Sequence, residues 1–240
     1  MNRRKTSLAG LTIGALLVVS AIGASFAAGQ SARDILERVD DLYRSKSSRA
    51  RMVMEVVTKH WSRKLVMEAW TKGKEKSLVR ILAPKKEKGM ATLKVGNDIW
   101  NWLPKVKRVM KVPSSMMSDS WMGSHFTNDD MVKESRMAED YDFKMTFRGE
   151  REGKKVVEIE CTPKPQAPVE WGKVVVMVED GTWIPLKVLY YDEEGDLART
   201  FIFGSVKKMG GRTIPAEMRV VPAGKPGEYT FVRYEKIEFD

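Results

Sequence analysis

Few side chains in this sequence are of the types that usually bind metals or act as nucleophiles. Among 240 residues there are two histidines, His60 and His125, and one cysteine, Cys161. Zinc sites combine imidazole and thiolate groups at short, regular spacings, and no such spacing occurs here. The lone cysteine also excludes an internal disulfide. We therefore expect no metal and no cofactor, and Cys161 is most simply a small buried residue of a strand.

The motifs of hydrolytic and phosphoryl-transfer enzymes are missing as well. The sequence has no G-x-S-x-G elbow, no phosphate-binding glycine loop and no H-E-x-x-H motif. Asp129 and Asp130 are adjacent and would diverge on a helix, so acids at a helix start are the favoured interpretation. His125 could be a pH-sensitive contact, but a solvated loop residue is the favoured interpretation. The sequence predicts a protein that is not an enzyme.

One charged segment is lopsided enough to suggest a binding surface. Between residues 85 and 111 the acids are Glu87 and Asp98. The cations of this segment are Lys85, Lys86, Lys88, Lys94, Lys105, Lys107, Arg108 and Lys111. A solvated outer sheet face and a surface that docks on an anionic membrane or an acidic partner both fit this composition. The candidate docking residues are Lys105, Lys107, Arg108 and Lys111.

Residues 112–132 stand out by their density of flexible apolar side chains. Gly123 interrupts the run, and Thr127 with Asp130 forms an acidic variant of the capping box, which predicts a second short helix. We expect a broken, Met-rich helical segment that lies over a sheet. Its methionines either fill a core or line a surface that accepts ligands of varied shape. Two pairs of its side chains are four residues apart and would share a helical face: Met117 with Trp121, and Met122 with Phe126.

The first 28 residues have the features of a signal peptide. A positive start is followed by the apolar residues 8–23, and Ser25-Phe26-Ala27 fits the small-x-small cleavage pattern. An uncleaved anchor is disfavoured because the apolar run is short for a membrane span. Cleavage would leave residues 29–240 as one soluble periplasmic domain, which we expect to be a monomer. The whole chain has a net charge of +10, and the signal peptide contains three basic residues and no acidic one. The mature protein would therefore have a net charge of +7.

This charge favours anionic surfaces, and export makes nucleic acid an unexpected partner.

The mature chain begins with a helix expected from Ser31 to Tyr43. Beyond residue 48 it consists almost throughout of short strands, for which residues 51–58 and 64–71 show the period of two. Gly96-Asn97-Asp98 predicts a tight hairpin. About a dozen such strands, evenly spaced and mostly joined by hairpin turns, predict a mainly β protein with a single antiparallel meander.

A meander of this size either closes into a barrel around a cavity or stays an open, curved sheet whose concave apolar face needs a cover. The N-terminal helix and the Met-rich segment are the candidates for that cover. The alternation of side chains does not decide which face is concave. From alternation and from membership in the covering segment, the candidate cavity-lining residues are Met52, Met54, Met67, Trp70, Trp102, Met116, Met117, Trp121, Met122 and Phe126.

Residues 121–130, WMGSHFTNDD, carry the pattern M-G-S-x-F-T-x-x-D. In the same order along the chain stand WNWLP at 100–104, WIPLK at 183–187, YDEEG at 191–195 and GRTIP at 211–215. This series resembles the bacterial outer-membrane lipoprotein-sorting (LolA-like) proteins. The position of His125 often carries Asp in that pattern, so no fixed acidic role transfers to it.

The resemblance implies an unclosed antiparallel β-barrel covered by helices, with an apolar cavity for acyl chains. It also implies a periplasmic location in a Gram-negative bacterium and neither cofactor nor catalysis. Relatives of this kind are often linked with inner-membrane exporters of lipids or hydrophobic molecules.

Two functions follow as hypotheses. The first is a periplasmic carrier of lipoprotein or lipid acyl chains, which receives cargo from an inner-membrane transporter or passes it to an outer-membrane receptor. The alternative is an accessory or lipid-sensing regulatory module of an inner-membrane exporter, for which the basic segment would matter more than a cavity. An enzyme that acts on envelope lipids is the least favoured class, because the sequence offers no catalytic constellation.

Overall fold

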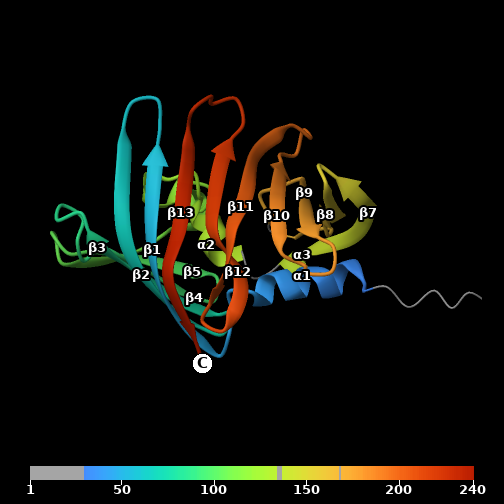
Figure 1. Cartoon of the computed structure of the whole chain (residues 1–240). Coiled ribbons are helices and arrows are strands. Elements are labelled where there is room, and N and C mark those ends of the chain that lie inside the picture. Colours follow the sequence, from blue (N-terminus) through green and yellow to red (C-terminus); the bar gives the residue numbers. More distant parts are fainter. Residues whose placement is uncertain (1–29, 134–136, 168) are drawn as a thin grey trace, which may run out of the picture.

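The computed structural model describes residues 30–133, 137–167 and 169–240. Thirteen strands and five short helical segments make up this part of the chain (Figure 1). The predicted signal peptide, residues 1–28, lies outside the described residues, so its removal stays a prediction. The strands are β1 (Ser47–Val57), β2 (Ser62–Lys72), β3 (Lys76–Ala83), β4 (Ala91–Val95), β5 (Asp98–Leu103), β6 (Arg108–Lys111), β7 (Tyr141–Arg151), β8 (Lys154–Pro163), β9 (Lys173–Glu179), β10 (Pro185–Tyr191), β11 (Leu197–Met209), β12 (Arg212–Pro222) and β13 (Tyr229–Phe239).

All thirteen strands form one antiparallel sheet in the order β6-β5-β4-β3-β2-β1-β13-β12-β11-β10-β9-β8-β7. Each strand pairs with the next one along the chain except β6 and β7, which are the two edges of the sheet. The sheet curves strongly, with β3 to β5 on one side and β7 to β10 on the other, but it does not close within the described residues (Figure 1). The predicted mainly β, antiparallel and unclosed architecture is confirmed, including the β4–β5 hairpin at Gly96.

The helices begin where the sequence provides capping residues. Helix α1 (Ala32–Asp41) starts at Ser31, whose Oγ accepts the amide of Asp34 at 3.2 Å while the Asp34 carboxylate accepts the amide of Ser31 at 3.1 Å. Both N-terminal amides are thereby satisfied. Helix α2 (Asn128–Lys133) begins in the same way, because Thr127 and Asp130 exchange bonds of 2.7 and 3.1 Å. Both predicted caps are present, and α3 (Met137–Asp140) follows.

The Met-rich segment is broken more thoroughly than the sequence suggests. Before α2 it contains two single 3₁₀ turns, η1 (Ser114–Met116) and η2 (Trp121–Gly123). Met122 lies in the left-handed region with φ of 52°, and an isolated bridge joins Ser120 to Thr127 and turns the segment back on itself. The expectation that residues four apart share a helical face is therefore wrong, because no continuous helix connects them.

The two covers lie on one face of the sheet. Alternate residues of β1 and β2 bury Met54, Leu65 and Met67 on that face. The same core contains Ile35 of α1 and Trp121 of the Met-rich segment. The concave side is therefore the side of Met54 and Met67, a choice that alternation left open. In Figure 1, α2 lies behind β12 and β13, and α1 crosses below β9 and β10.

Candidate functional site

A cavity of about 310 Å³ lies between the concave face and its covers. Its floor comes from strands β1 to β4, β7 and β9 to β13, and its cover from α1, the Met-rich segment, α3 and residues 169–171. Drug-sized ligands and cofactors occupy cavities of about 300–1,000 Å³ that are mostly apolar with a few polar groups. The size and position of this cavity therefore fit a small apolar ligand or part of a larger one.

Five of the ten predicted lining residues border this cavity. They are Met52, Met54, Met67, Trp121 and Phe126. The sequence reasoning missed a larger apolar group from the second half of the sheet, whose alternation offered the same signal. This missed group comprises Val174, Val188, Tyr190, Phe201, Phe203, Met218, Val232 and Tyr234.

The other five predicted residues do not border the cavity. Trp70 projects from the opposite face of β2, where the guanidinium groups of Arg49 and Arg80 lie 5.9 and 5.1 Å from its ring. Trp102 and Met116 are exposed at 36% and 46%. The remaining two are Met117, which is half-buried in the cover, and Met122, which packs against the core without reaching the cavity. A single Met or Trp side chain at a strand position carries no information about which face is covered.

Polar contacts attach the Met-rich segment to the sheet. The indole Nε1 of Trp121 donates to Thr92 Oγ1 of β4 at 3.1 Å, and Arg63 of β2 donates to the carbonyl of Met122. His125 binds Thr230 of β13 through its amide at 2.9 Å and its Nδ1 at 2.8 Å. The interpretation of His125 as a solvated loop residue is wrong, because its side chain is only 12% exposed.

The strongest of these attachments is an ion pair between α2 and β11. The two terminal guanidinium nitrogens of Arg199 donate to the Asp130 carboxylate, at 2.7 and 2.5 Å, and Arg199 is 5% exposed. Burial, the largest single cause, would lower the pKa of Arg199, but the charge and the hydrogen bonds of Asp130, with smaller contributions from Tyr190 and Glu170, together raise that pKa. Bidentate pairing of this kind fixes geometry as well as charge. Asp130 thus has a structural role, in agreement with the helix-start interpretation.

Acidic groups gather near the same end of the cover. Burial is the main cause that raises the pKa of Tyr141 above its ordinary value, and the nearby carboxyl groups of Asp129, Asp140 and Glu170 act in the same direction. All three acids border the cavity. Tyr141 therefore stays protonated at neutral pH and can donate a hydrogen bond inside a largely apolar space.

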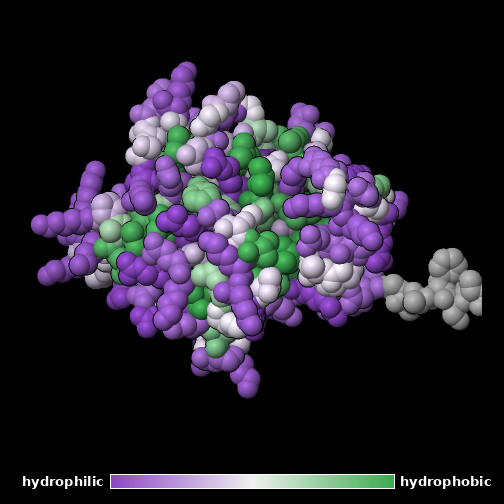
Figure 2. All heavy atoms as spheres, in the orientation of Figure 1, coloured by the Kyte–Doolittle hydropathy of each residue, from purple (hydrophilic) through white to green (hydrophobic). Residues whose placement is uncertain are grey.

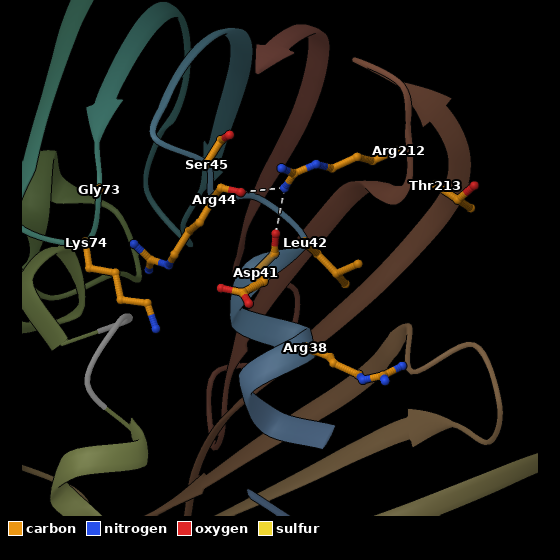
Figure 3. Close-up of a pocket in the computed structure, with 9 residues that line it drawn as sticks. All are labelled: Arg38, Asp41, Leu42, Arg44, Ser45, Gly73, Lys74, Arg212 and Thr213. Atoms are coloured by element: carbon orange, nitrogen blue, oxygen red, sulfur yellow. Dashed lines mark hydrogen bonds between the residues drawn. The ribbon is translucent and has the colours of Figure 1, made fainter. Parts of the chain in front are cut away.

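A second, open groove of about 580 Å³ lies at the C-terminal end of α1. Arg212 of β12 donates to the Asp41 carbonyl at 2.7 Å and to the Arg44 carbonyl, which ties the end of the helix to the sheet. Figure 3 shows the side chains of Arg44 and Lys74 on the same side of the groove, while Arg38 points away from them. The groove is lined by Arg38, Asp41, Leu42, Arg44, Ser45, Gly73, Lys74, Arg212 and Thr213.

The predicted docking residues lie at the edge of the sheet, on the β5–β6 hairpin. Lys105, Lys107, Arg108 and Lys111 are all exposed there. Apolar neighbours are exposed with them, including Val109 at 64% and Met110 at 53%. In Figure 2, hydrophobic side chains appear among hydrophilic ones at the side of the molecule where Figure 1 places β3. Lys94 differs from this group, because it is buried on the concave side and donates to the Lys74 carbonyl at 2.8 Å.

Residues 30–133, 137–167 and 169–240 hold no group of three or more His, Cys, Asp or Glu side chains arranged around a metal ion. Within the same ranges, no helix has the length and apolar character needed to cross a bilayer.

Comparison with solved structures defines the class of fold. A DUF1329 family protein from Desulfovibrio piger superposes with a TM-score of 0.79 at 23% identity, over 87% of this chain and 92% of that one. A putative outer membrane lipoprotein-sorting protein domain from Vibrio parahaemolyticus gives 0.76 at 24% identity, over 87% and 92%. A LolA superfamily protein from Nitrosomonas europaea gives 0.74 at 22% identity, over 88% and 94%. The fold is LolA-like, as the sequence motifs indicated.

Comparison with models of protein families shows which family the chain belongs to. A model described as "Uncharacterized protein" matches residues 73–240. This match spans more than half of the chain, which therefore belongs to that family. A comparison with curated proteins finds no match.

Proposed function

We propose that this protein is a non-catalytic periplasmic carrier that holds the acyl chain of a lipid or lipoprotein in the cavity beneath the Met-rich segment. The observation that carries the proposal is the cavity of about 310 Å³, walled by apolar side chains of a curved sheet and roofed by a separate segment. The LolA-like fold and the lipoprotein-sorting name of one structural neighbour support the same function.

Burial of hydrocarbon is sufficient to drive this binding. Each buried methylene contributes about 0.8 kcal/mol, so about a dozen of them contribute about 10 kcal/mol before the costs of ordering the chain. Flexible methionines such as Met52, Met131 and Met218 border the cavity and can adapt to chains of different length. Specificity for one acyl length is therefore not expected.

The carrier function is tested by lipid extraction. Protein purified from the periplasm of a Gram-negative host should yield lipid in near-stoichiometric amount by mass spectrometry. Ala69 borders the cavity, and the indole of an Ala69→Trp variant would occupy it. We expect this variant to lose the lipid while keeping the circular dichroism spectrum of the wild type.

Val206→Trp is the matched control, because Val206 is 49% exposed and lies outside the cavity lining. It adds the same indole to the sheet without filling the space. Lipid retained by the cavity-filling variant, or absent from the wild-type protein, contradicts the carrier function.

The β5–β6 hairpin supports a second part of the proposal, docking on an anionic membrane surface where cargo is exchanged. Exposed apolar side chains lie between exposed cations there, notably Val106 between Lys105 and Lys107. Cations are attracted to anionic headgroups, and apolar side chains can enter the interface between headgroups and acyl chains. An acidic protein partner would require cations but would leave the exposed apolar residues without a role.

Co-sedimentation with vesicles tests this docking. Charge reversal of Lys105, Lys107 and Arg108 to Glu should abolish binding to phosphatidylglycerol vesicles at low salt and leave the extracted lipid unchanged. Reversal of Lys154, Lys155 and Lys208, three exposed lysines elsewhere on the sheet, changes the net charge equally and should have a much smaller effect. Equal losses in the two variants contradict a docking role for the hairpin.

The accessory or regulatory function remains the alternative, and the same variants distinguish it. If the hairpin reversal abolishes capture of an inner-membrane protein but vesicle binding persists, the hairpin recognises a protein. If only lipid uptake fails in that variant, both docking hypotheses are wrong.

A further inference from the structure

We infer that the protein selects an amphiphile with an anionic, phosphate-bearing headgroup, which Arg44 and Lys74 bind at the mouth of the cavity. This inference deepens the proposed function and rests on it, because the acyl chain of the same molecule would occupy the cavity. It concerns the end of the cavity near α1, which is remote in the sequence from the β5–β6 hairpin.

The groove at the end of α1 and the apolar cavity share part of their lining. Arg44, Gly73 and Lys74 border both spaces. The cavity lining includes apolar residues such as Tyr43, Ala50 and Ile237 beside polar ones such as Ser48 and Thr71. Tyr43 stacks on Tyr234 at 5.4 Å between ring centroids, and its hydroxyl donates to the Pro215 carbonyl at 2.6 Å. A polar groove thus adjoins a largely apolar space.

The charge at this junction is one-sided. The groove is lined by four cations, Arg38, Arg44, Lys74 and Arg212, and by one acid, Asp41. Lys76 and Lys94 extend the basic character into the cavity lining. The acids of that lining are Asp40, Asp129, Asp130, Asp140 and Glu170. Asp130 pairs with Arg199, the charges of Asp129, Asp140 and Glu170 raise the pKa of Tyr141, and Asp40 also has a partner within the protein.

The basic junction is built from several parts of the chain. Lys94 is 5% exposed and its Nζ donates to the Lys74 carbonyl, so the β2–β3 turn that carries Lys74 is held by a buried side chain of β4. Arg212 binds the Arg44 carbonyl and so holds the segment that carries Arg44. Arg44 and Lys74 also have partners within the protein, so an incoming anion joins or replaces those contacts.

Figure 3 shows the side chains of Arg44 and Lys74, which come from different elements, on the same side of the groove that both residues line. Arginine and lysine are the side chains that most often bind phosphate, and several charge-assisted bonds to one anion are stronger than neutral ones. A phosphate at this junction would remain in contact with water while its acyl chain runs into the cavity. Zwitterionic headgroups would bring a cation to the same basic site and should bind less well.

Lipid loading of the mature protein tests this selectivity. Delipidated protein would be incubated with phosphatidylglycerol or phosphatidylcholine of identical acyl chains, and the bound lipid quantified by mass spectrometry. We expect a preference of at least about tenfold for phosphatidylglycerol. The double variant Arg44→Gln with Lys74→Gln should lose the preference and still load both lipids to the level of phosphatidylcholine in the wild type.

The matched control is Lys46→Gln with Lys72→Gln. These exposed lysines lie two residues from Arg44 and from Lys74 but border neither space, and their removal changes the net charge equally. This variant should keep the wild-type preference. Equal loading of the two lipids by the wild type, or equal loss of preference in both variants, overturns the headgroup site and leaves the carrier function standing. No loading of either lipid contradicts the carrier function itself.

Free phosphate is the other source of the same chemistry. Inorganic phosphate at millimolar concentration should not displace loaded phosphatidylglycerol, because it lacks the hydrocarbon that drives binding. The opposite result has two parts: phosphate alone raises the melting temperature of the wild type but not of the Arg44/Lys74 variant, and the two lipids load equally. In that case the junction binds a free anion, and the lipid-headgroup assignment is wrong.

Discussion

The two faces of the sheet both carry large apolar side chains, yet only the concave face is covered. Met54 and Met67 lie under α1 and the Met-rich segment and are almost fully buried. On the outer side, near β5 and β6, Leu93 and Val109 are 40% and 64% exposed, and Val109 is flanked by basic residues in the sequence. Apolar composition therefore does not identify the core of this protein. The cover decides which residues stabilise the fold and which are available to other molecules.

The largest effect is expected when the ion pair between Arg199 and Asp130, which attaches the cover to the sheet, is removed. Arg199→Met leaves the partly buried Asp130 carboxylate without its guanidinium partner, and loss of one member of a buried pair costs about 3–5 kcal/mol. We expect the free energy of unfolding, measured in urea, to fall by that amount, and the Met-rich segment to exchange its amide protons faster. Arg151→Met removes an exposed ion pair with Glu158 and should cost less than about 1 kcal/mol. Similar losses in the two variants would show that the cover does not depend on Arg199.

A pair of truncations to alanine compares the two faces directly. Met54→Ala removes a fully buried side chain of the concave face and should lower the free energy of unfolding by about 2–5 kcal/mol. Val109→Ala removes a side chain of the outer face that is 64% exposed and should change stability by less than about 0.5 kcal/mol. Chemical denaturation of both variants gives the two values. A small loss for Met54→Ala would mean that the cavity relaxes around the truncated side chain.

Alkaline pH gives a smaller effect that reports on the covered face. Burial is the main cause that raises the pKa of Cys161 from 9.0 to about 12. The folded thiol stays protonated in this range while the unfolded thiol ionises. The contribution of Cys161 to the free energy of unfolding is therefore complete below pH 9 and is lost as the pH rises toward 12. Near pH 10 the loss approaches about 1.4 kcal/mol. Cys161→Ala should flatten the stability profile in this range, which urea titrations at several pH values would measure.

Thiol labelling extends the same test to the opposite face. Native Cys161 should resist iodoacetamide at pH 8, whereas a thiol at the neighbouring exposed position, in Thr162→Cys with Cys161→Ala, should react readily. Equal labelling of the two proteins contradicts the assignment of faces in β8.

The smallest expected effect concerns one hydrogen bond of the cover. Trp121→Phe retains most of the apolar contact but removes the indole donor to Thr92, and Thr92 keeps its bond of 2.8 Å to Asn101. We expect a loss of about 1 kcal/mol in urea denaturation. Thr146→Val, which removes an exposed side-chain bond to Glu158, serves as a comparison and should cost less. A loss above about 3 kcal/mol would mean that the Trp121 ring itself is displaced.

Sequence patterns predicted the local structure well, but only five of the ten predicted lining residues border the cavity. The period-two alternation located the strands of β1 and β2, and the capping residues Ser31 and Thr127 located two helix starts. The candidate lining failed at Trp70 because alternation separates the faces of a strand without saying which is covered. It failed at Met122 because a left-handed residue redirects the chain there, which i, i+4 spacing does not reveal.

The sequence by itself determined the strands, their antiparallel order, the helix starts and the presence of a Met-rich segment, because each depends on residues close together in the chain. Only the tertiary structure decided which face became concave, which basic residues met at the mouth of the cavity and how the cover is held. Arg199 reaches Asp130 across 69 positions of sequence, and Arg212 reaches the Arg44 carbonyl across 168. Such contacts follow from the curvature of the whole sheet, to which every strand contributes and which no local period encodes.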